Sequence, residues 1–484
     1  MDRPRRIDDL ADELISHILS FLLGSEPSSN DTSPTNSHGS YVPNGSYAHG
    51  ETSDLDRFRL VCARFKRIAT PWKFPRFVLR FSRDGFRRLE DLLDMQLACH
   101  VRSFTYMVRP FYQGSDWSRV LKAVESQNLA ISQVHKSRRE DQEYIITGAH
   151  DMLLLRRAIS AFSSLQQIKL LRLQDGADEQ LLDYIREQSS AETVYLDWES
   201  ACTRAVTSLA ISLLESNCSA IRFVGPQISP ESAVKLSQTP PLALSTLGAR
   251  LTSIDVTFHS PKDMTSSIKS VSSVFHDFFL SAKNLTSIKL GFRANMPLDL
   301  SLELIFHRLQ WKRLRALSIQ GWRLDSEEVI SLIRRHRRQL RDIALAGVYL
   351  RNGGRWRDIL SVLHDEMDQV ERIDLRDIDY ADHLDSDSPD TNGHASTSST
   401  SVLSVVPEPT LALPPYHASF NADYPFISPC GSTRRSFSEA TLERLRALTA
   451  DDLGDNGLSV RHEQRLLWEA WVLSSPGNML RRRQ

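Results

Sequence analysis

The short phrase Leu285-Thr-Ser-Ile-Lys-Leu290 has apolar residues at its first, fourth and sixth positions. Its end, Ile288-Lys-Leu290, alternates apolar and polar residues, which is the period of a half-buried β-strand. Leu251-Thr-Ser-Ile-Asp-Val256 is nearly a copy of the phrase. A strand that recurs in this way predicts a structure built from tandem units.

Further copies of the phrase lie on both sides of these two. They begin at Val101, Leu165, Ala191, Cys218, Leu314, Leu340 and Val370. From Leu165 onward the starts are 26 to 34 residues apart, and segments with helical spacing separate several of them. A single strand and helix cannot bury an apolar face, so neighbouring units must stack into one core. The sequence therefore predicts an α/β chain with a parallel sheet, and the alternative is a doubly wound α/β domain.

In such a stack the middle residue of each strand phrase points away from the helices. These residues are mixed in charge and mostly polar, which suits a protein surface better than an apolar small molecule. We therefore predict a target-binding face that consists of Lys169, Tyr195, Arg222, Asp255, Lys289, Ser318 and Asp374, with Ala344 in the same register. The alternative is that each of these is an ordinary solvated strand residue.

The overall composition excludes several classes of protein. A chain of 484 residues that is 41% hydrophobic can build a sizeable core. The 59 basic and 60 acidic residues leave a net charge of -1, which argues against a nucleic-acid binder. No apolar run of about 18 residues exists, so we expect no membrane segment. The five cysteines form no C-x-x-C pair, which is typical of reduced thiols in the cytoplasm or the nucleus.

Two stretches are too polar to pack. Residues 24–53 are rich in Ser, Asn, Thr and Gly, and residues 381–435 begin with an acidic run and continue with Ser, Thr and Pro. Neither buries enough apolar surface to offset the entropy of ordering the chain, so both are predicted to be disordered. Residues 436–484 regain helical spacing, which predicts a short helical tail.

The N-terminus carries two apolar stripes with helical spacing. Leu10, Leu14, Ile18 and Leu22 form the first, and a second runs from Leu55 to Ala69 beyond the polar insert. Ile15 and Leu19 lie off the first stripe, so that helix is apolar on more than one side. Two short helices hold little core of their own, so the surplus apolar surface needs a partner or the rest of the chain.

These two stripes carry a family resemblance. Ile7-Asp-Asp-Leu10-Ala-Asp-Glu-Leu14 resembles the opening of an F-box, and Leu60-Val-Cys-Ala-Arg-Phe65 resembles its close. Ala11 stands where the family usually has Pro. The repeats resemble leucine-rich repeats, without the Asn or Cys that the family often has eight residues after each repeat start. The chain is thus similar to fungal F-box proteins with a leucine-rich-repeat-like region.

The resemblance implies a domain order. Residues 1–79 would be the small α-helical F-box with its insert, and residues 80–380 an irregular α/β solenoid, or horseshoe, followed by the linker and the tail. The F-box family binds a Skp-type adaptor and, through it, a cullin. The implied adaptor contacts are Leu10, Ala11, Leu14, Ile15, Ile18, Leu22, Val61, Cys62 and Phe65.

The function that follows is that of a non-catalytic substrate receptor in an SCF-type (Skp–cullin–F-box) ubiquitin ligase. The sequence contains no phosphate-binding loop, no H-E-x-x-H and no G-x-S-x-G, so no catalytic residue, metal or cofactor is expected. Neither nucleic acid nor a membrane is an expected partner, and the sequence does not identify the target. One alternative is an interaction scaffold that binds the adaptor without directing ubiquitination. Another is an enzyme whose groups converge only in the fold.

Overall fold

The computed structural model describes residues 10–22, 54–187, 194–229, 241–260, 262–367, 369–381 and 439–475. The two stretches that were predicted to be disordered, 24–53 and 381–435, lie outside these residues except for Ala381. No helix within the described ranges combines the length and the apolar character that crossing a membrane requires.

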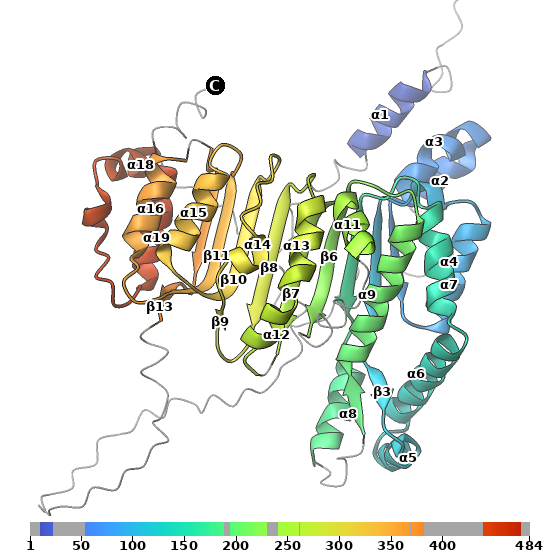
Figure 1. Ribbon diagram of the computed structural model, residues 1–484. Helices are drawn as coiled ribbons and strands as arrows, with labels where there is room; N and C mark the ends of the chain where they lie inside the picture. The colour runs from blue at the N-terminus through green and yellow to red at the C-terminus, as the bar shows by residue number, and fades with distance from the viewer. Residues whose placement is uncertain are drawn as a thin grey trace, which may run out of the picture.

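A large parallel sheet forms the middle of the molecule (Figure 1). Its neighbouring strands are β1 (Arg76–Arg80), β2 (Ser103–Val108), β4 (Gln167–Arg172), β6 (Ile221–Ile228), β7 (Leu251–His259), β8 (Ser287–Arg293), β10 (Ala316–Leu324), β11 (Asp342–Leu350) and β12 (Arg372–Arg376), with the short β9 (Leu298–Asp299) and β13 (Asp379–Tyr380) beside β10 and β11. From β1 to β12 these strands lie side by side in the order in which they occur in the chain. A doubly wound sheet instead reverses its strand order at a switch point. The predicted α/β class and parallel sheet are confirmed.

The strands form where the repeated phrase places alternating apolar residues. Ile288 and Leu290 of β8 are buried, and Lys289 between them is only partly covered. Because alternate side chains point to opposite faces of a sheet, the apolar residues gather on one face. Helices pack over that face (Figure 1). They are α4 (Arg83–Asp94), α7 (His150–Ala161), α9 (Trp198–Glu215), α11 (Pro241–Arg250), α12 (Thr265–Ser270), α13 (Ser272–Ser281), α14 (Glu303–Phe306), α15 (Ser326–Arg335) and α16 (Trp356–Asp365).

Two glycines interrupt adjacent strands at the same level. Gly321 in β10 and Gly347 in β11 have φ values of +74° and +55°, a region that glycine enters without steric cost. The ladder pairs Gln320 with Ala346 and resumes with Trp322 and Val348 beyond them. A Cβ atom on Gly321 would lie 1.8 Å from the carbonyl oxygen of Phe292, so no side chain fits there.

A smaller substructure lies beside the sheet. It contains α5 (Trp117–Gln127), α6 (Leu129–Thr147), α8 (Gly176–Glu187) and an antiparallel pair of strands, β3 (Phe111–Gln113) and β5 (Tyr195–Asp197). Its own apolar core includes Trp117, Leu121 and Leu181. The phrase that begins at Ala191 was predicted to supply a strand of the main sheet, and that prediction is wrong. Its strand β5 pairs with β3 instead, in a separate sheet.

The described N-terminal part forms three helices. They are α1 (Asp12–Leu22), α2 (Asp54–Val61) and α3 (Ala63–Lys73), which we call the helical module. β1 follows α3 within a few residues and pairs with β2. The parallel sheet therefore begins inside the range 1–79 that the resemblance implies for an F-box, directly beside the helical module.

The C-terminal helices close the far end of the sheet. These are α18 (Glu439–Leu445), a 3₁₀ turn (Ala450–Leu453) and α19 (His462–Leu473) (Figure 1). The helix α19 lies against β12 and α16, the turn packs on α16, and α18 packs on α19. A carboxylate oxygen of Glu469 accepts a hydrogen bond from the backbone amide of Leu375 in β12, at 2.8 Å. Trp471 stacks on His364, with ring centroids 4.1 Å apart. The segment predicted as a tail thus covers the edge strand.

Candidate functional site

The helical module brings together two stretches that are far apart in sequence. Asp12, in the first turn of α1, accepts hydrogen bonds from Arg64 and Arg67 of α3. The Arg64 Nε to Asp12 Oδ1 distance is 2.7 Å, and the same guanidinium also donates to the carbonyl oxygen of Leu10. The hydrogen bond from Arg64 lowers the pKa of the Asp12 carboxyl, and the charges of both arginines lower it further. Charge-assisted contacts therefore hold α1 on α3.

Large apolar side chains of the helical module face outward. Leu14, Ile18 and Phe21 of α1 are 53%, 39% and 74% exposed. On α2, Leu60 and Val61 are 79% and 65% exposed. Several large apolar residues left exposed on short neighbouring helices mark a protein-interaction surface more often than a solvated one. Of the predicted adaptor contacts, Leu14, Ile18 and Val61 are placed where a partner could reach them.

Other predicted adaptor contacts are buried, and for these the assignment is corrected. Ile15 is 1% exposed and Phe65 is 4% exposed, so neither offers surface to a partner. Phe65 stacks on Phe58 with ring centroids 4.4 Å apart, which joins α3 to α2. Helical periodicity finds apolar residues but does not say which side of the helix the neighbouring helix covers.

The remaining predicted contacts have mixed positions. Ala11 is exposed and Leu10 is partly covered. Cys62 is exposed, and its Sγ accepts a hydrogen bond from the Phe65 amide as the N-cap of α3. Leu22 is the last residue of α1, and its side chain lies outside the described residues. Ala11 and Cys62 thus stay accessible beside Leu14 and Val61.

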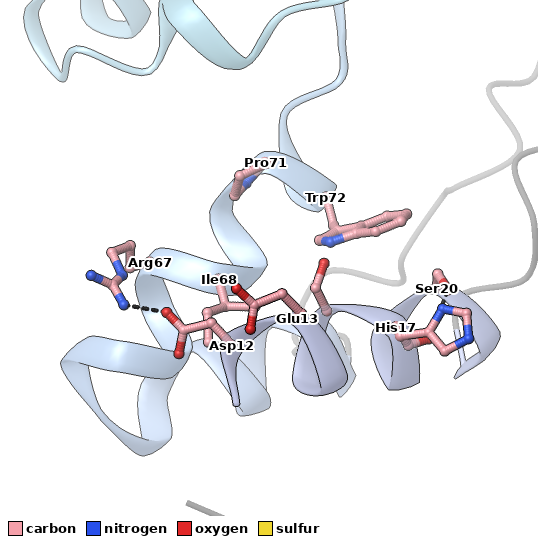
Figure 2. Close-up of a pocket in the computed structure, with 9 residues that line it drawn as sticks. Asp12, Glu13, His17, Ser20, Arg67, Ile68, Pro71 and Trp72 are labelled. Atoms are coloured by element: carbon pink, nitrogen blue, oxygen red, sulfur yellow. Dashed lines mark hydrogen bonds and ion pairs between the residues drawn. The ribbon is translucent and has the colours of Figure 1, made fainter. Parts of the chain in front are cut away.

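An open hollow of about 560 Å³ lies between α1 and the end of α3. Figure 2 shows Trp72 and Pro71 of α3 on one side, with Glu13 and His17 of α1 on the other. The rim carries the Asp12–Arg67 ion pair. The helical module therefore presents both exposed apolar side chains and a recess with an indole wall.

The predicted target-binding residues form one row across the parallel sheet. Lys169 pairs with Val224, Val224 with Asp255, and Asp255 with Lys289. The row continues through Ser318, Ala344 and Asp374 on the next three strands. We call the side of the sheet that carries this row, opposite the buried apolar residues, the polar face. The structure thus brings together five of the seven predicted residues.

Two of the predicted residues do not belong to that row. Arg222 is on the polar face but pairs with Gln167 and Ser253, one row nearer the start of the strands. The strand β6 pairs with β4 two residues away from the alignment that the repeated phrase predicts, so that Val224 rather than Arg222 lies opposite Lys169. Tyr195 is 57% exposed on β5, outside the parallel sheet. Val224 takes the position that was assigned to Arg222.

Charges on the later strands of the polar face are paired with each other. Lys289 Nζ lies 3.2 Å from Asp255 Oδ2. Burial raises the pKa of Asp255, and the Lys289 ammonium opposes that effect. The Arg372 guanidinium donates to Asp342 at 2.8 Å, and Arg376 pairs with Asp374. Between β7 and β12, Lys289, Arg372 and Arg376 are therefore neutralised by carboxylates of the same face.

The first strands of the polar face differ, because their charges have one sign. Arg76 on β1, Lys169 on β4 and Arg222 on β6 make no ion pair within the described part of the chain. Burial lowers the pKa of the Lys169 ammonium, and the positive charges of Arg76 and Arg222 lower it further. The three cations are therefore close enough to repel one another.

The sequence did not indicate a buried polar network in the smaller substructure. Arg109 and Arg138 each bind both Asp175 and Asp178, and Asp178 is buried. Nearby, His135 Nδ1 lies 2.7 Å from the Tyr112 hydroxyl and Nε2 lies 3.0 Å from a backbone carbonyl. Burial lowers the pKa of His135 to about 4, so its ring is neutral at pH 7. The network joins α6 to the start of α8.

No group of three or more His, Cys, Asp or Glu side chains in the described ranges is arranged to hold a metal ion. Comparisons with known proteins add no family assignment: no family model matches this chain, and no curated protein sequence matches it.

Proposed function

We propose that this protein is the F-box substrate receptor of an SCF-type ubiquitin ligase, acting in the cytoplasm or the nucleus. Its helical module binds a Skp-type adaptor, which connects it to a cullin, and the polar face of the sheet binds the protein to be ubiquitinated. The receptor catalyses nothing. It acts by holding the target near a charged ubiquitin-conjugating enzyme, which raises the effective concentration of the two.

One observation carries the proposal. Leu14, Ile18 and Phe21 are exposed on a helix that is nevertheless fixed to α3 through Asp12 and Arg64. A helix held in place with its large apolar side chains outward is suited to packing against a helical partner. The sequence of the same two segments resembles the F-box opening and close, which names the class of partner.

The test is affinity purification of the full chain and of a Leu14→Asp, Ile18→Asp variant. The matched control is Leu129→Asp, Leu153→Asp, because those leucines are 52% and 58% exposed on α6 and α7, which are not part of the helical module. We expect the first variant to lose the Skp-type adaptor and the cullin together, and the control to keep both. Both variants should keep the thermal unfolding midpoint of the wild type, because no core side chain changes.

The outcomes separate the alternatives. Recovery of the adaptor without any cullin would favour a scaffold that does not direct ubiquitination. Unchanged adaptor binding by Leu14→Asp, Ile18→Asp would remove the case for the helical module as the docking surface.

A further inference from the structure

The polar face of the sheet is divided by charge, and the division points to the chemistry of its ligand. From β7 onward, Lys289, Arg372 and Arg376 have acidic partners on the neighbouring strand or the same one. On β1, β4 and β6, Arg76, Lys169 and Arg222 have none among the described residues. We call these three residues the cationic patch.

The cationic patch has a defined geometry. Arg76 and Arg222 belong to one row, because Ser103 and Gln167 of the two intervening strands pair with them and with each other. Adjacent strands are about 4.8 Å apart, so three intervals separate the two arginines by roughly 14 Å. Lys169 lies between them, two residues further along β4 than Gln167. An extended peptide covers that distance in about four residues.

The patch also has polar side chains between its cations. Ser103 and Gln167 lie 3.4 Å apart between the two arginines, through Oγ and Oε1. Arg76 and Arg222 are exposed, while Lys169 is partly covered. A partly covered cation costs free energy when other cations are near and no anion is. Burial and the neighbouring Arg76 and Arg222 therefore lower the pKa of Lys169. A ligand with carboxylates would remove that cost.

We propose that the cationic patch binds an acidic segment of the target protein, with two or three carboxylates placed along about four residues. This inference rests on the proposed function, since it names the chemistry of the target. Nucleic acid is the less suitable ligand, because three cations are few against the six to ten phosphate contacts, roughly, of a salt-dependent binder.

The position of the patch fits a receptor. Arg76 opens β1 directly after α3, so the patch lies at the end of the sheet beside the helical module. A target held there would be close to the adaptor rather than at the distant edge covered by α19.

The experiment uses the full chain and a fluorescent peptide in which Glu alternates with Ser, followed by fluorescence anisotropy. The test variant is Arg76→Gln, Lys169→Gln, Arg222→Gln. The control is Arg156→Gln, Arg334→Gln, Arg341→Gln, which removes the same charge from residues that pair with Glu215, Glu366 and Glu371. We expect about a tenfold loss of affinity in the test variant and little change in the control.

Equal losses in both variants, or no loss in either, would overturn the proposal. Tighter binding of a single-stranded RNA of equal charge would assign the patch to nucleic acid instead. The chain's own acidic run can also be tested, by changing Asp382, Asp385, Asp387 and Asp390 to Asn. If the peptide binds only to that variant, the acidic run occupies the patch in the wild type, and a segment of a separate target protein is not its ligand.

Adaptor binding, measured in parallel, keeps the two proposals apart. The Arg76, Lys169 and Arg222 variant should still capture the adaptor. If the wild type captures the adaptor but not the peptide, the acidic ligand is wrong and the receptor function stands. If the wild type binds the peptide but never the adaptor, the receptor function fails and the cationic patch remains a binding site for acidic segments.

Discussion

The helical module and the parallel sheet use apolar residues in opposite ways. In the sheet, Trp322, Leu317 and Ile319 of β10 are buried to within a few per cent. In the helical module α2 buries none of its residues, and α1 presents Leu14 and Phe21 outward. The sheet therefore buries its apolar residues, while the helical module buries some of its own, such as Ile15 and Phe65, and leaves others exposed.

The largest effect should come from the core of the sheet. Trp322 is fully buried, donates through Nε1 to the Leu300 carbonyl at 2.7 Å and contacts Phe292. Trp322→Ala should lower the free energy of unfolding by about 3–5 kcal/mol. Phe21→Ala, at an exposed aromatic of the helical module, should change it by less than about 0.5 kcal/mol. Urea unfolding measures both, and similar losses would contradict the division of roles.

A smaller effect is expected from the backbone of the sheet. Gly321→Ala places a Cβ against the Phe292 carbonyl at a positive φ, so we expect a loss of at least about 2 kcal/mol. Gly353→Ala is the control, because its φ is also positive, at +91°, but a Cβ there meets no neighbour within 4 Å. That control should cost about 1 kcal/mol. Equal thermal shifts for the two variants would mean that β10 adjusts freely at Gly321.

The smallest effect concerns the contact between α1 and α3. The pKa of Asp12 is lower in the folded chain than its unfolded value of about 3.9, so the folded carboxyl binds protons less readily. The stability that the contact gives to the folded chain is therefore fully present above the unfolded pKa. It is lost as the pH falls through the lowered pKa of the folded carboxyl. Hydrogen exchange of the α1 amides should show protection at pH 7 that disappears in acid.

Asp12→Asn is the reference for that measurement. It should weaken the protection of α1 already at pH 7 and remove the change with pH, because Asn does not titrate in this range. Equal protection of α1 in Asp12→Asn and in the wild type at pH 7 would show that packing alone holds the helix.

Much of the sheet could be predicted because its phrase repeats. Ile288 and Leu290 are buried as the period of two requires, and Lys169, Asp255 and Lys289 fall in one row. The same phrase was misleading at Tyr195, since a strand phrase does not specify its partner strand. At Arg222 the face was predicted correctly and the row was not, because the phrase does not fix the alignment of β6 against β4.

Other features depend on packing that one segment does not specify. β1 was not predicted, because it is a lone strand that precedes the first copy of the phrase. Ile15 lies off the stripe that contains Leu14, yet both looked available to a partner, and only the position of α3 decides which of them is buried. Arg76 joined Lys169 and Arg222 only once the strand order was known.

The hydrogen bond between Glu469 and Leu375 has a consequence for the order of events during translation. The acceptor follows the donor by 94 residues. At about 5–20 residues per second, the edge of β12 emerges roughly 5–20 s before its cover is synthesised. During that interval a nascent chain exposes strand amides that can pair with another chain. A ribosome that terminates early within residues 382–438 would leave that edge open permanently and yield an aggregation-prone product.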